Sequence, residues 1–113
     1  MDCLFCSIIE KKITSKIVYE DDHVLAFEDI HPQAPVHILI IPRKHISTVL
    51  EVTPGDNALL GHMFQAANII AKNMGIAERG FRLVMNFNRE AGQTVFHIHL
   101  HLLAGRIMRW PPG

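Results

Sequence analysis

Hydrophobic positions change their spacing several times along the chain, and each spacing predicts a different element. Between residues 4 and 9 they fall at i, i+1, i+4 and i+5, which predicts a short amphipathic helix. The apolar runs 17–19 and 24–27 flank the polar turn 20–23, which is the pattern of a β-hairpin. A β-rich run over 36–41 follows a proline-punctuated loop and predicts a central strand.

The second half of the chain predicts one long helix and two more strands. Residues 53–56 have the pattern of a helix start, and apolar residues then recur at helical spacing until Gly75, a helix stop. The runs 81–87 and 95–103 are apolar or alternating, and the polar link 88–94 predicts that they pair antiparallel. We therefore expect an α+β fold, with an antiparallel sheet of about five strands and one long and one short helix.

Size and charge narrow the class of protein. With 113 residues, 49% hydrophobic and 19% charged, the chain is expected to form a single domain over residues 1–113. Eleven basic and eleven acidic residues argue against nucleic acid or an anionic membrane as partner. An acid follows Met1 where a signal peptide needs positive charge, and no apolar stretch approaches the roughly 20 residues of a membrane span. These features predict a cytoplasmic protein.

Three of the eight histidines fall within residues 97–101. On a strand, His97, His99 and His101 would form a row on one face, with the outer pair about 13 Å apart, too far to share one metal ion. A neutral imidazole is a good nucleophile toward phosphorus if an acceptor holds its other nitrogen, and the middle histidine is best placed for this. Just upstream, Gly92 and Thr94 offer backbone N–H groups and a hydroxyl to a phosphate, although an ordinary hairpin link would contain the same residues.

Residues 92–103 resemble the signature of the histidine triad superfamily, in which three histidines alternate with apolar residues. The segments 29–37, 41–47 and 110–113 are similar to its Hint branch, which hydrolyses nucleoside phosphoramidates and related adenylates. The resemblance implies a HIT-like fold that pairs as a homodimer, with one purine nucleotide site in each subunit.

The resemblance also implies a role for each polar residue. His99 would attack the α-phosphorus and form a covalent nucleotidyl-histidine, from which water releases AMP or GMP without a metal in the chemical step. His101 would bind a phosphate oxygen, His97 would support the row, and His37 would join the network from a neighbouring strand. Thr94 replaces the usual serine and keeps its hydroxyl.

Nucleotide-binding positions carry over in the same way. Asp29 matches the ribose-binding acid, while Asn86 and the Gly92 backbone match phosphate-side contacts. Five apolar residues match positions that enclose the base, namely Phe5, Ile8, Ile13, Phe27 and Ile30. Each has a simpler interpretation as well, since Asp29 can cap a turn, Asn86 can satisfy a strand end, and the apolar set can be core.

The two cysteines form one C-x-x-C, Cys3 and Cys6, which is half of a metal site. His45 and His97 are candidates to complete a tetrahedral Cys₂His₂ zinc site. Some bacterial proteins that this chain resembles carry structural zinc at matching positions, and others lack the cysteines. The alternative is a pair of reduced cysteines that act as small hydrophobic residues in a helix.

Two other classes of function remain open at this point. The chain would serve as a nucleotide-binding regulatory or scaffold protein if it binds nucleotide with little turnover, because a site does not by itself determine a rate. It would serve as a structural zinc protein if removal of the metal unfolds it. The resemblance favours a hydrolase of purine nucleoside 5′-phosphoramidates.

Overall fold

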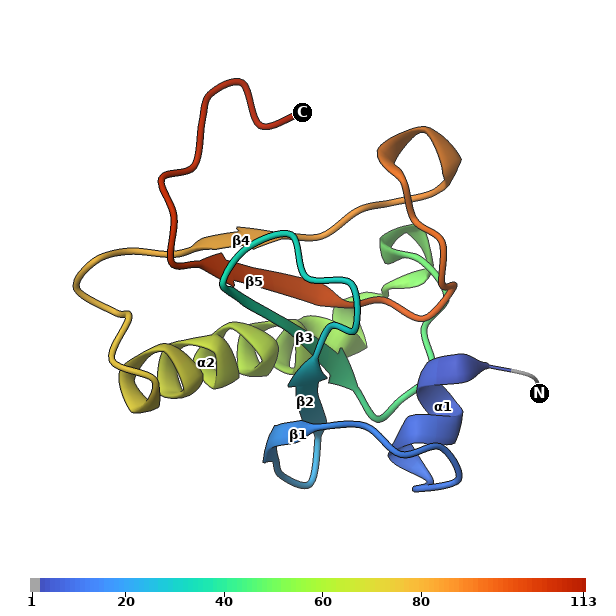
Figure 1. The fold of residues 1–113 in the computed structure, drawn as a ribbon. Coiled ribbons are helices and arrows are strands. Elements are labelled where there is room, and N and C mark those ends of the chain that lie inside the picture. Colours follow the sequence, from blue (N-terminus) through green and yellow to red (C-terminus); the bar gives the residue numbers. More distant parts are fainter. Residues whose placement is uncertain (1–2) are drawn as a thin grey trace.

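The computed structural model describes residues 3–113; Met1 and the acid after it, on which the signal-peptide argument rested, lie outside the described residues. Five strands form one antiparallel sheet, as expected, and the sheet order is β1-β2-β3-β5-β4 (Figure 1). The strands are β1 (Ile17–Glu20), β2 (Val24–Glu28), β3 (Val36–Pro42), β4 (Arg82–Val84) and β5 (Leu100–Ala104). The predicted hairpin is confirmed as β1 and β2, and the predicted central strand is β3.

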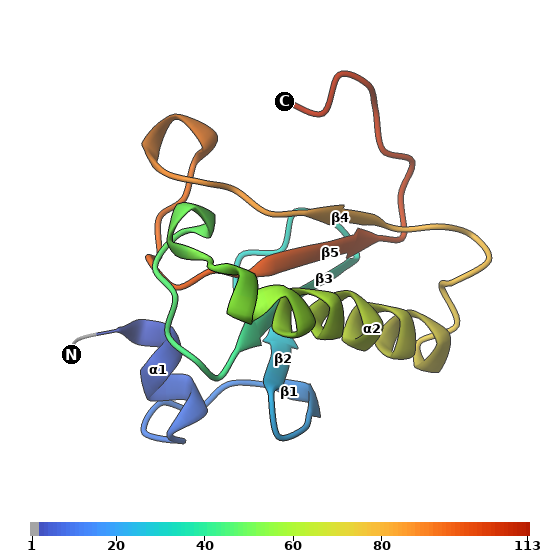
Figure 2. The ribbon, with the colours of Figure 1, turned by 180° about the vertical axis from the view of Figure 1, so that it is seen from behind.

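One face of the sheet is covered by the long helix α2 (Asn57–Asn73), which is seen in front of the strands in Figure 2. The helix follows a 3₁₀ turn over Pro54–Asp56, where the Thr53 N–H donates to the buried Asp56 carboxylate at 3.0 Å. Buried α2 residues pack against alternate residues of β2, β3 and β5, which puts Met63, Ala67 and Ile70 in one cluster with Val24, Ile38, Ile40 and Leu102. This cluster is the main core.

The short helix α1 (Leu4–Ile9) packs against the opposite face of the sheet. Successive side chains of a strand point to opposite faces, and the apolar residues of β2 and β3 that point away from α2 are buried under α1. Its Phe5 and Ile8 are buried with Phe27 and Leu39, and the Phe5 and Phe27 rings meet edge to face at 5.5 Å. Because α1 has only six residues, part of this face is left open beside it.

The last two strands are shorter than the sequence predicted, and this changes the setting of the histidines. The β3–β5 ladder ends at the pair Ile40 and Leu100, so only His101 of the three lies on a strand. The expectation of a row of three histidines on one strand is therefore wrong. Pro42 has no N–H to extend the ladder, and its carbonyl accepts instead from Nε2 of His97 at 2.7 Å.

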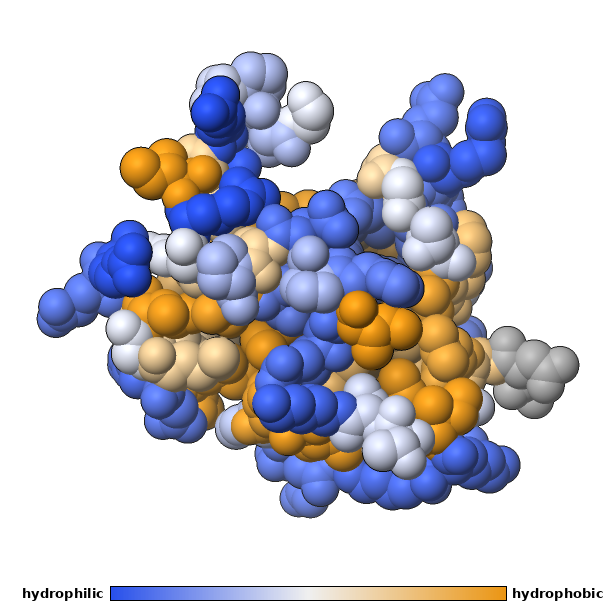
Figure 3. All heavy atoms as spheres, in the orientation of Figure 1, coloured by the Kyte–Doolittle hydropathy of each residue, from blue (hydrophilic) through white to orange (hydrophobic). Residues whose placement is uncertain are grey.

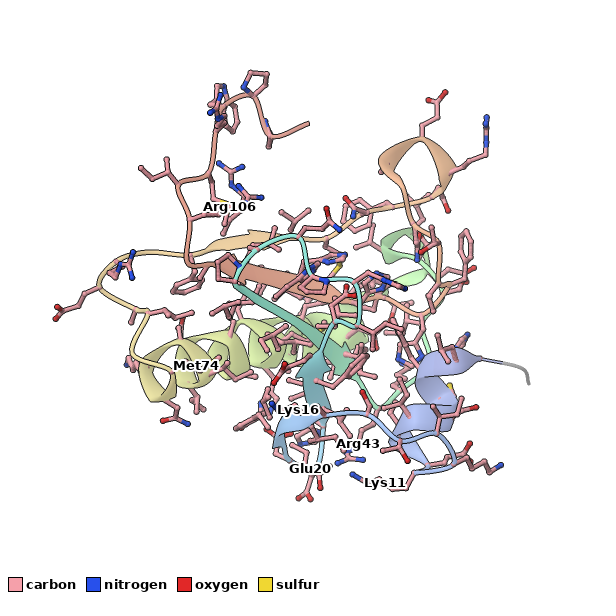
Figure 4. All side chains as sticks on the ribbon, viewed as in Figure 1. Lys11, Lys16, Glu20, Arg43, Met74 and Arg106 are labelled. Atoms are coloured by element: carbon pink, nitrogen blue, oxygen red, sulfur yellow. The ribbon has the colours of Figure 1, made fainter. Side chains whose placement is uncertain are left out.

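Charged side chains gather below the β1 hairpin, where Figure 4 labels Lys11, Glu20 and Arg43. Glu20 accepts a hydrogen bond from Lys11 Nζ at 2.8 Å and lies 3.7 Å from an Arg43 nitrogen. These exposed ion pairs contribute little to stability, so packing on the two faces of the sheet holds the fold together.

Residues 105–113 leave the end of β5 and extend away from the sheet (Figure 1). Ile107 and Trp110 in this tail are 89% and 83% exposed. Among residues 3–113 no helix combines the length and the hydrophobicity that a membrane crossing needs.

Two glycines give a matched test of backbone packing. At Gly105, with φ +94°, an added Cβ would lie 2.8 Å from the Pro35 side chain, whereas at Gly61 in α2 it would meet nothing within 4 Å. We expect Gly105→Ala to lower the free energy of unfolding by about 2 kcal/mol or more. Gly61→Ala should raise it by about 0.5–1 kcal/mol. Urea unfolding of both variants measures this, and an unchanged midpoint for Gly105→Ala would contradict it.

Candidate active site

A cavity of about 300 Å³ lies on the α1 side of the sheet. On the face shown in Figure 3, hydrophobic surface gathers between α1 and the loop that follows β2. The cavity is lined by Leu4, Phe5, Ile8, Ile13, Thr14, Ser15, Phe27, Asp29, Ile30, His31, Leu39, Thr94, Val95, His99 and His101. An apolar wall therefore faces a carboxylate, a hydroxyl and two imidazoles.

All five apolar residues predicted to enclose a base line this cavity. Phe5, Ile8 and Phe27 are also buried core residues, so the core interpretation and the cavity interpretation both hold for them. Ile13 and Ile30 differ, because they are 42% and 84% exposed. They stand at the rim, where a bound ring would cover them.

Four predicted phosphate-side or supporting residues lie away from the cavity wall. Half-buried Asn86 and exposed Gly92 are not among the described residues that line the cavity. His97 is fully buried and turns toward the cysteines. His37 lies behind the cavity, hydrogen bonded to His101.

A main-chain contact determines which nitrogen of the buried His99 imidazole carries the proton. Its Nδ1 lies 2.9 Å from the main-chain carbonyl oxygen of His97, which can only accept, so Nδ1 carries the ring proton. Nε2 then keeps its lone pair. Burial lowers the His99 pKa, against the opposing effects of this hydrogen bond and of the Asp29 charge. The ring is therefore neutral at pH 7, with an unprotonated Nε2.

His37 and His101 form a hydrogen-bonded pair, called here the histidine relay, and a main-chain N–H determines which ring donates. The Gln33 N–H donates to Nδ1 of His37 at 3.0 Å, which leaves the His37 proton on Nε2. That Nε2 donates to Nδ1 of His101 at 2.9 Å, so the His101 proton lies on its Nε2. His101 thus has an N–H to offer, while His99 has a lone pair.

Asp29 makes two contacts within the protein and also lines the cavity. Oδ1 accepts the His31 N–H at 2.8 Å, so Asp29 does cap a turn. Oδ2 lies 3.5 Å from Nε2 of His37, and the residue also lines the cavity. The carboxylate is therefore held in place and still faces the space that a ligand would occupy.

The relay histidines are neutral because they are removed from water. Burial, with smaller contributions from the neighbouring His99 and His37, lowers the pKa of His101 to about 4, against the opposing effect of Asp29. Burial also lowers the pKa of His37, again opposed by Asp29. Neither ring needs to be charged for the relay to form.

Next to the cavity, the four predicted metal ligands come together. The Cys3 and Cys6 sulfurs lie 3.5 and 3.6 Å from Nδ1 of His97, Cys6 lies 3.4 Å from Nδ1 of His45, and the two Nδ1 atoms are 3.2 Å apart. Tetrahedral zinc has bonds of about 2.3 Å to sulfur and 2.0–2.1 Å to nitrogen. It therefore places a sulfur ligand about 3.6 Å from a nitrogen ligand, and two nitrogen ligands about 3.3 Å apart. The four side chains fit this ion.

The surroundings of the cluster orient its ligands. Cys3 caps α1 and its sulfur accepts the Cys6 N–H at 3.4 Å, which puts both thiols on one side of the first turn. Nε2 of His97 donates to the Pro42 carbonyl, so its Nδ1 lone pair points at the cluster. Burial, followed by the nearby Cys3, raises the pKa of the metal-free Cys6 thiol to about 11.

Gln93 is a positioning residue that the sequence did not reveal. It is 4% exposed, and its Nε2 donates to the carbonyls of Ser47 at 2.7 Å and Val95 at 3.2 Å. Its Oε1 accepts the Asn88 N–H at 2.8 Å, so the amide anchors the link that carries Thr94. A glutamine in a polar, glycine-containing link looks like a solvated residue, so no sequence signal marks it.

An antiparallel α+β fold with this buried histidine relay defines a histidine triad protein. The HIT domain family model matches residues 10–108, and the chain belongs to this family. It is 54% identical over 105 residues to the purine nucleoside phosphoramidase of Escherichia coli strain K12, covering 93% of this chain and 88% of that protein. It is 53% identical to an uncharacterized HIT-like protein of Synechocystis, covering 99% and 97%.

Solved structures agree with this assignment. A HIT family hydrolase from Legionella pneumophila superposes with a TM-score of 0.97 at 52% identity, covering 99% of this chain and all of that one (100%). A histidine triad protein from Clostridium difficile gives a TM-score of 0.94 at 42% identity, covering 96% and 95%. The predicted fold class and family are thereby confirmed.

The lowered pKa of His101 predicts how stability depends on pH. In the unfolded chain the pKa of this histidine is near 6.5. Below that pH the unfolded chain binds a proton and the folded ring does not, so the folded state loses stability as the pH falls. His101→Asn keeps an acceptor for His37 but does not titrate. We expect the melting temperature to fall less steeply between about pH 7 and pH 5 in His101→Asn than in the wild type. Equal slopes in thermal melts would contradict this.

Proposed function

We propose that the protein is a hydrolase that cleaves the P–N bond of purine nucleoside 5′-phosphoramidates and related adenylates through a nucleotidyl-histidine. One observation carries this proposal, the unprotonated Nε2 of His99 in a cavity that also contains Asp29 and an apolar wall. The name of the Escherichia coli relative, purine nucleoside phosphoramidase, supports the substrate class.

His99 acts first. Its Nε2 lone pair attacks the α-phosphorus, a P–N bond to the imidazole forms, and the P–N bond to the amine breaks. The amine leaves with the bonding electron pair and takes up a proton from solvent, and the water that attacks in the second step returns a proton to solvent. Water then attacks the phosphorus, breaks its bond to His99 and releases AMP or GMP, and the ring returns to its neutral form.

The other residues bind the substrate around this reaction. The Nε2–H of His101 donates to a phosphate oxygen, and His37 holds the His101 tautomer. Thr94 offers a hydroxyl on the same side of the cavity. Asp29 accepts from the ribose hydroxyls, and the base lies against Phe5, Ile8, Ile13, Phe27 and Ile30.

Single-turnover mass spectrometry with an adenosine phosphoramidate tests the reaction. We expect an adenylyl group on His99, and a fall in kcat of at least about 10³-fold in His99→Ala with AMP binding retained. His23→Ala is the matched control, because His23 is exposed and lies outside the cavity. Binding without adduct or turnover would favour the regulatory or scaffold protein instead.

We also propose that Cys3, Cys6, His45 and His97 hold a structural zinc ion. The distances and the orientation of His97 support this. Bound there, zinc would supply a cross-link between the first turn of α1 and the segments that carry the two histidines, without a direct contact to the cavity.

Metal analysis tests the zinc proposal. The purified protein should carry about one zinc per chain, and Cys3→Ser combined with Cys6→Ser should release it, because two thiolate ligands are lost. His23→Gln should retain the metal. A folded wild-type protein purified without zinc would overturn this proposal.

The homodimer implied by the resemblance is a further proposal. Large apolar side chains stand exposed on α2 and on the tail, with Phe64 50%, Ile107 89% and Trp110 83% accessible. Such surfaces are typical of a face that a second copy covers. Sedimentation velocity at micromolar concentration measures this, and a monomer there would contradict it.

A further inference from the structure

The segment that carries the nucleophile, residues 95–99, is not held by the sheet, because the β3–β5 ladder ends at Leu100. Main-chain contacts hold it instead. The Ile98 N–H donates to the carbonyl of Ile46 at 2.7 Å, and the amide of Gln93 donates to the carbonyl of Val95 at 3.2 Å. Two side chains of the segment hold it as well. Ile98 is buried in the main core, and the His97 ring donates from Nε2 to the Pro42 carbonyl while its Nδ1 faces the four-ligand cluster.

His97 therefore connects two sites through one residue. Its imidazole faces Cys3, Cys6 and His45, while its carbonyl oxygen accepts the Nδ1 proton of His99 at 2.9 Å. That carbonyl determines which nitrogen of His99 has a free lone pair. A movement of the His97 ring that turns its main chain would release the proton of His99 to either nitrogen.

Phe5 supplies a second connection. Phe5 belongs to α1 and lies between Cys3 and Cys6 in the sequence. Its ring centroid is 6.0 Å from that of His97 and 5.1 Å from that of His99. If the first turn of α1 loses its attachment to the cluster, the ring that packs edge to face on the nucleophile is free to shift with it.

The cluster does not touch the space that the nucleotide would occupy. None of its four residues is among the described residues that line the cavity. Any effect of metal occupancy on the reaction must therefore pass through the protein, and the His97 carbonyl and the Phe5 ring are the contacts that reach His99.

We propose that a metal ion bound by Cys3, Cys6, His45 and His97 positions the His99 imidazole and selects its reactive tautomer, so that metal occupancy controls the rate of the first chemical step. His97 acts here as a positioning residue. The inference rests on the zinc site and the hydrolase reaction proposed above.

NMR of ¹⁵N-labelled imidazoles at neutral pH gives a readout that does not depend on activity. Four samples are compared: zinc-loaded wild type, wild type after chelation, His45→Gln, and the control His23→Gln. We expect a single His99 tautomer with its proton on Nδ1 in the zinc-loaded wild type and in the control. The chelated protein and His45→Gln should show a mixture of both tautomers while circular dichroism shows them folded.

Kinetics on the same samples separate positioning from binding. Metal loss should slow single-turnover adenylylation of His99 by at least about tenfold while the Kd for AMP changes by less than about twofold. Zinc added back to the chelated wild type should restore both the tautomer and the rate.

Three results would overturn the proposal. One is an unchanged tautomer and rate in a folded, metal-free protein, and another is a slower rate with an unchanged tautomer. The third is unfolding of the wild type on chelation, which would give the metal a purely structural role. If zinc-loaded protein forms no adduct with His99, the hydrolase proposal fails by itself, and the tautomer comparison still decides whether the metal positions the ring.

Discussion

Burial of uncharged imidazoles is the constraint on which the rest of this structure depends. A histidine taken out of water is neutral, and a neutral ring has one donor and one acceptor, which the protein must match separately. Here main-chain groups do this matching. The carbonyls of Pro42 and His97 and the N–H of Gln33 determine where the protons of His97, His99 and His37 lie. Main-chain positions are set by the fold, so the fold determines the reactivity of each ring.

The sheet places this chemistry by dividing its two faces between helices of different length. The 17 residues of α2 cover one face and form the main core there, with Met63 and Ile70 among its residues. The six residues of α1 close only part of the other face. The uncovered part, beside Phe5 and Phe27, becomes the cavity. There β5 presents His101 to the cavity, and β3 holds His37 behind it.

Local periodicity predicted the elements that depend on local physics. The β1–β2 hairpin, the central strand and the long helix ending near Gly75 follow from apolar spacing, turn residues and caps. The start of β5 was missed because it depends on Pro42, which is more than fifty positions away in sequence and ends the ladder by lacking an N–H.

The C-x-x-C spacing predicted two metal ligands, while the resemblance to the histidine triad superfamily brought in Asp29 and His37. The buried amide of Gln93 had no signal, since its partners are main-chain atoms, which no residue type marks, and one of them, the Ser47 carbonyl, lies in a distant segment.

The tail beyond β5 has an optical consequence. Trp110 is the chain's single tryptophan, and its indole stands almost entirely in solvent at the end of the molecule farthest along the chain from α1. Fluorescence excited at the red edge of the protein's absorption band therefore comes from this one residue. The sheet, both helices and the histidine cavity contribute none. The protein has a built-in fluorophore that reports only on what surrounds its own C-terminal end.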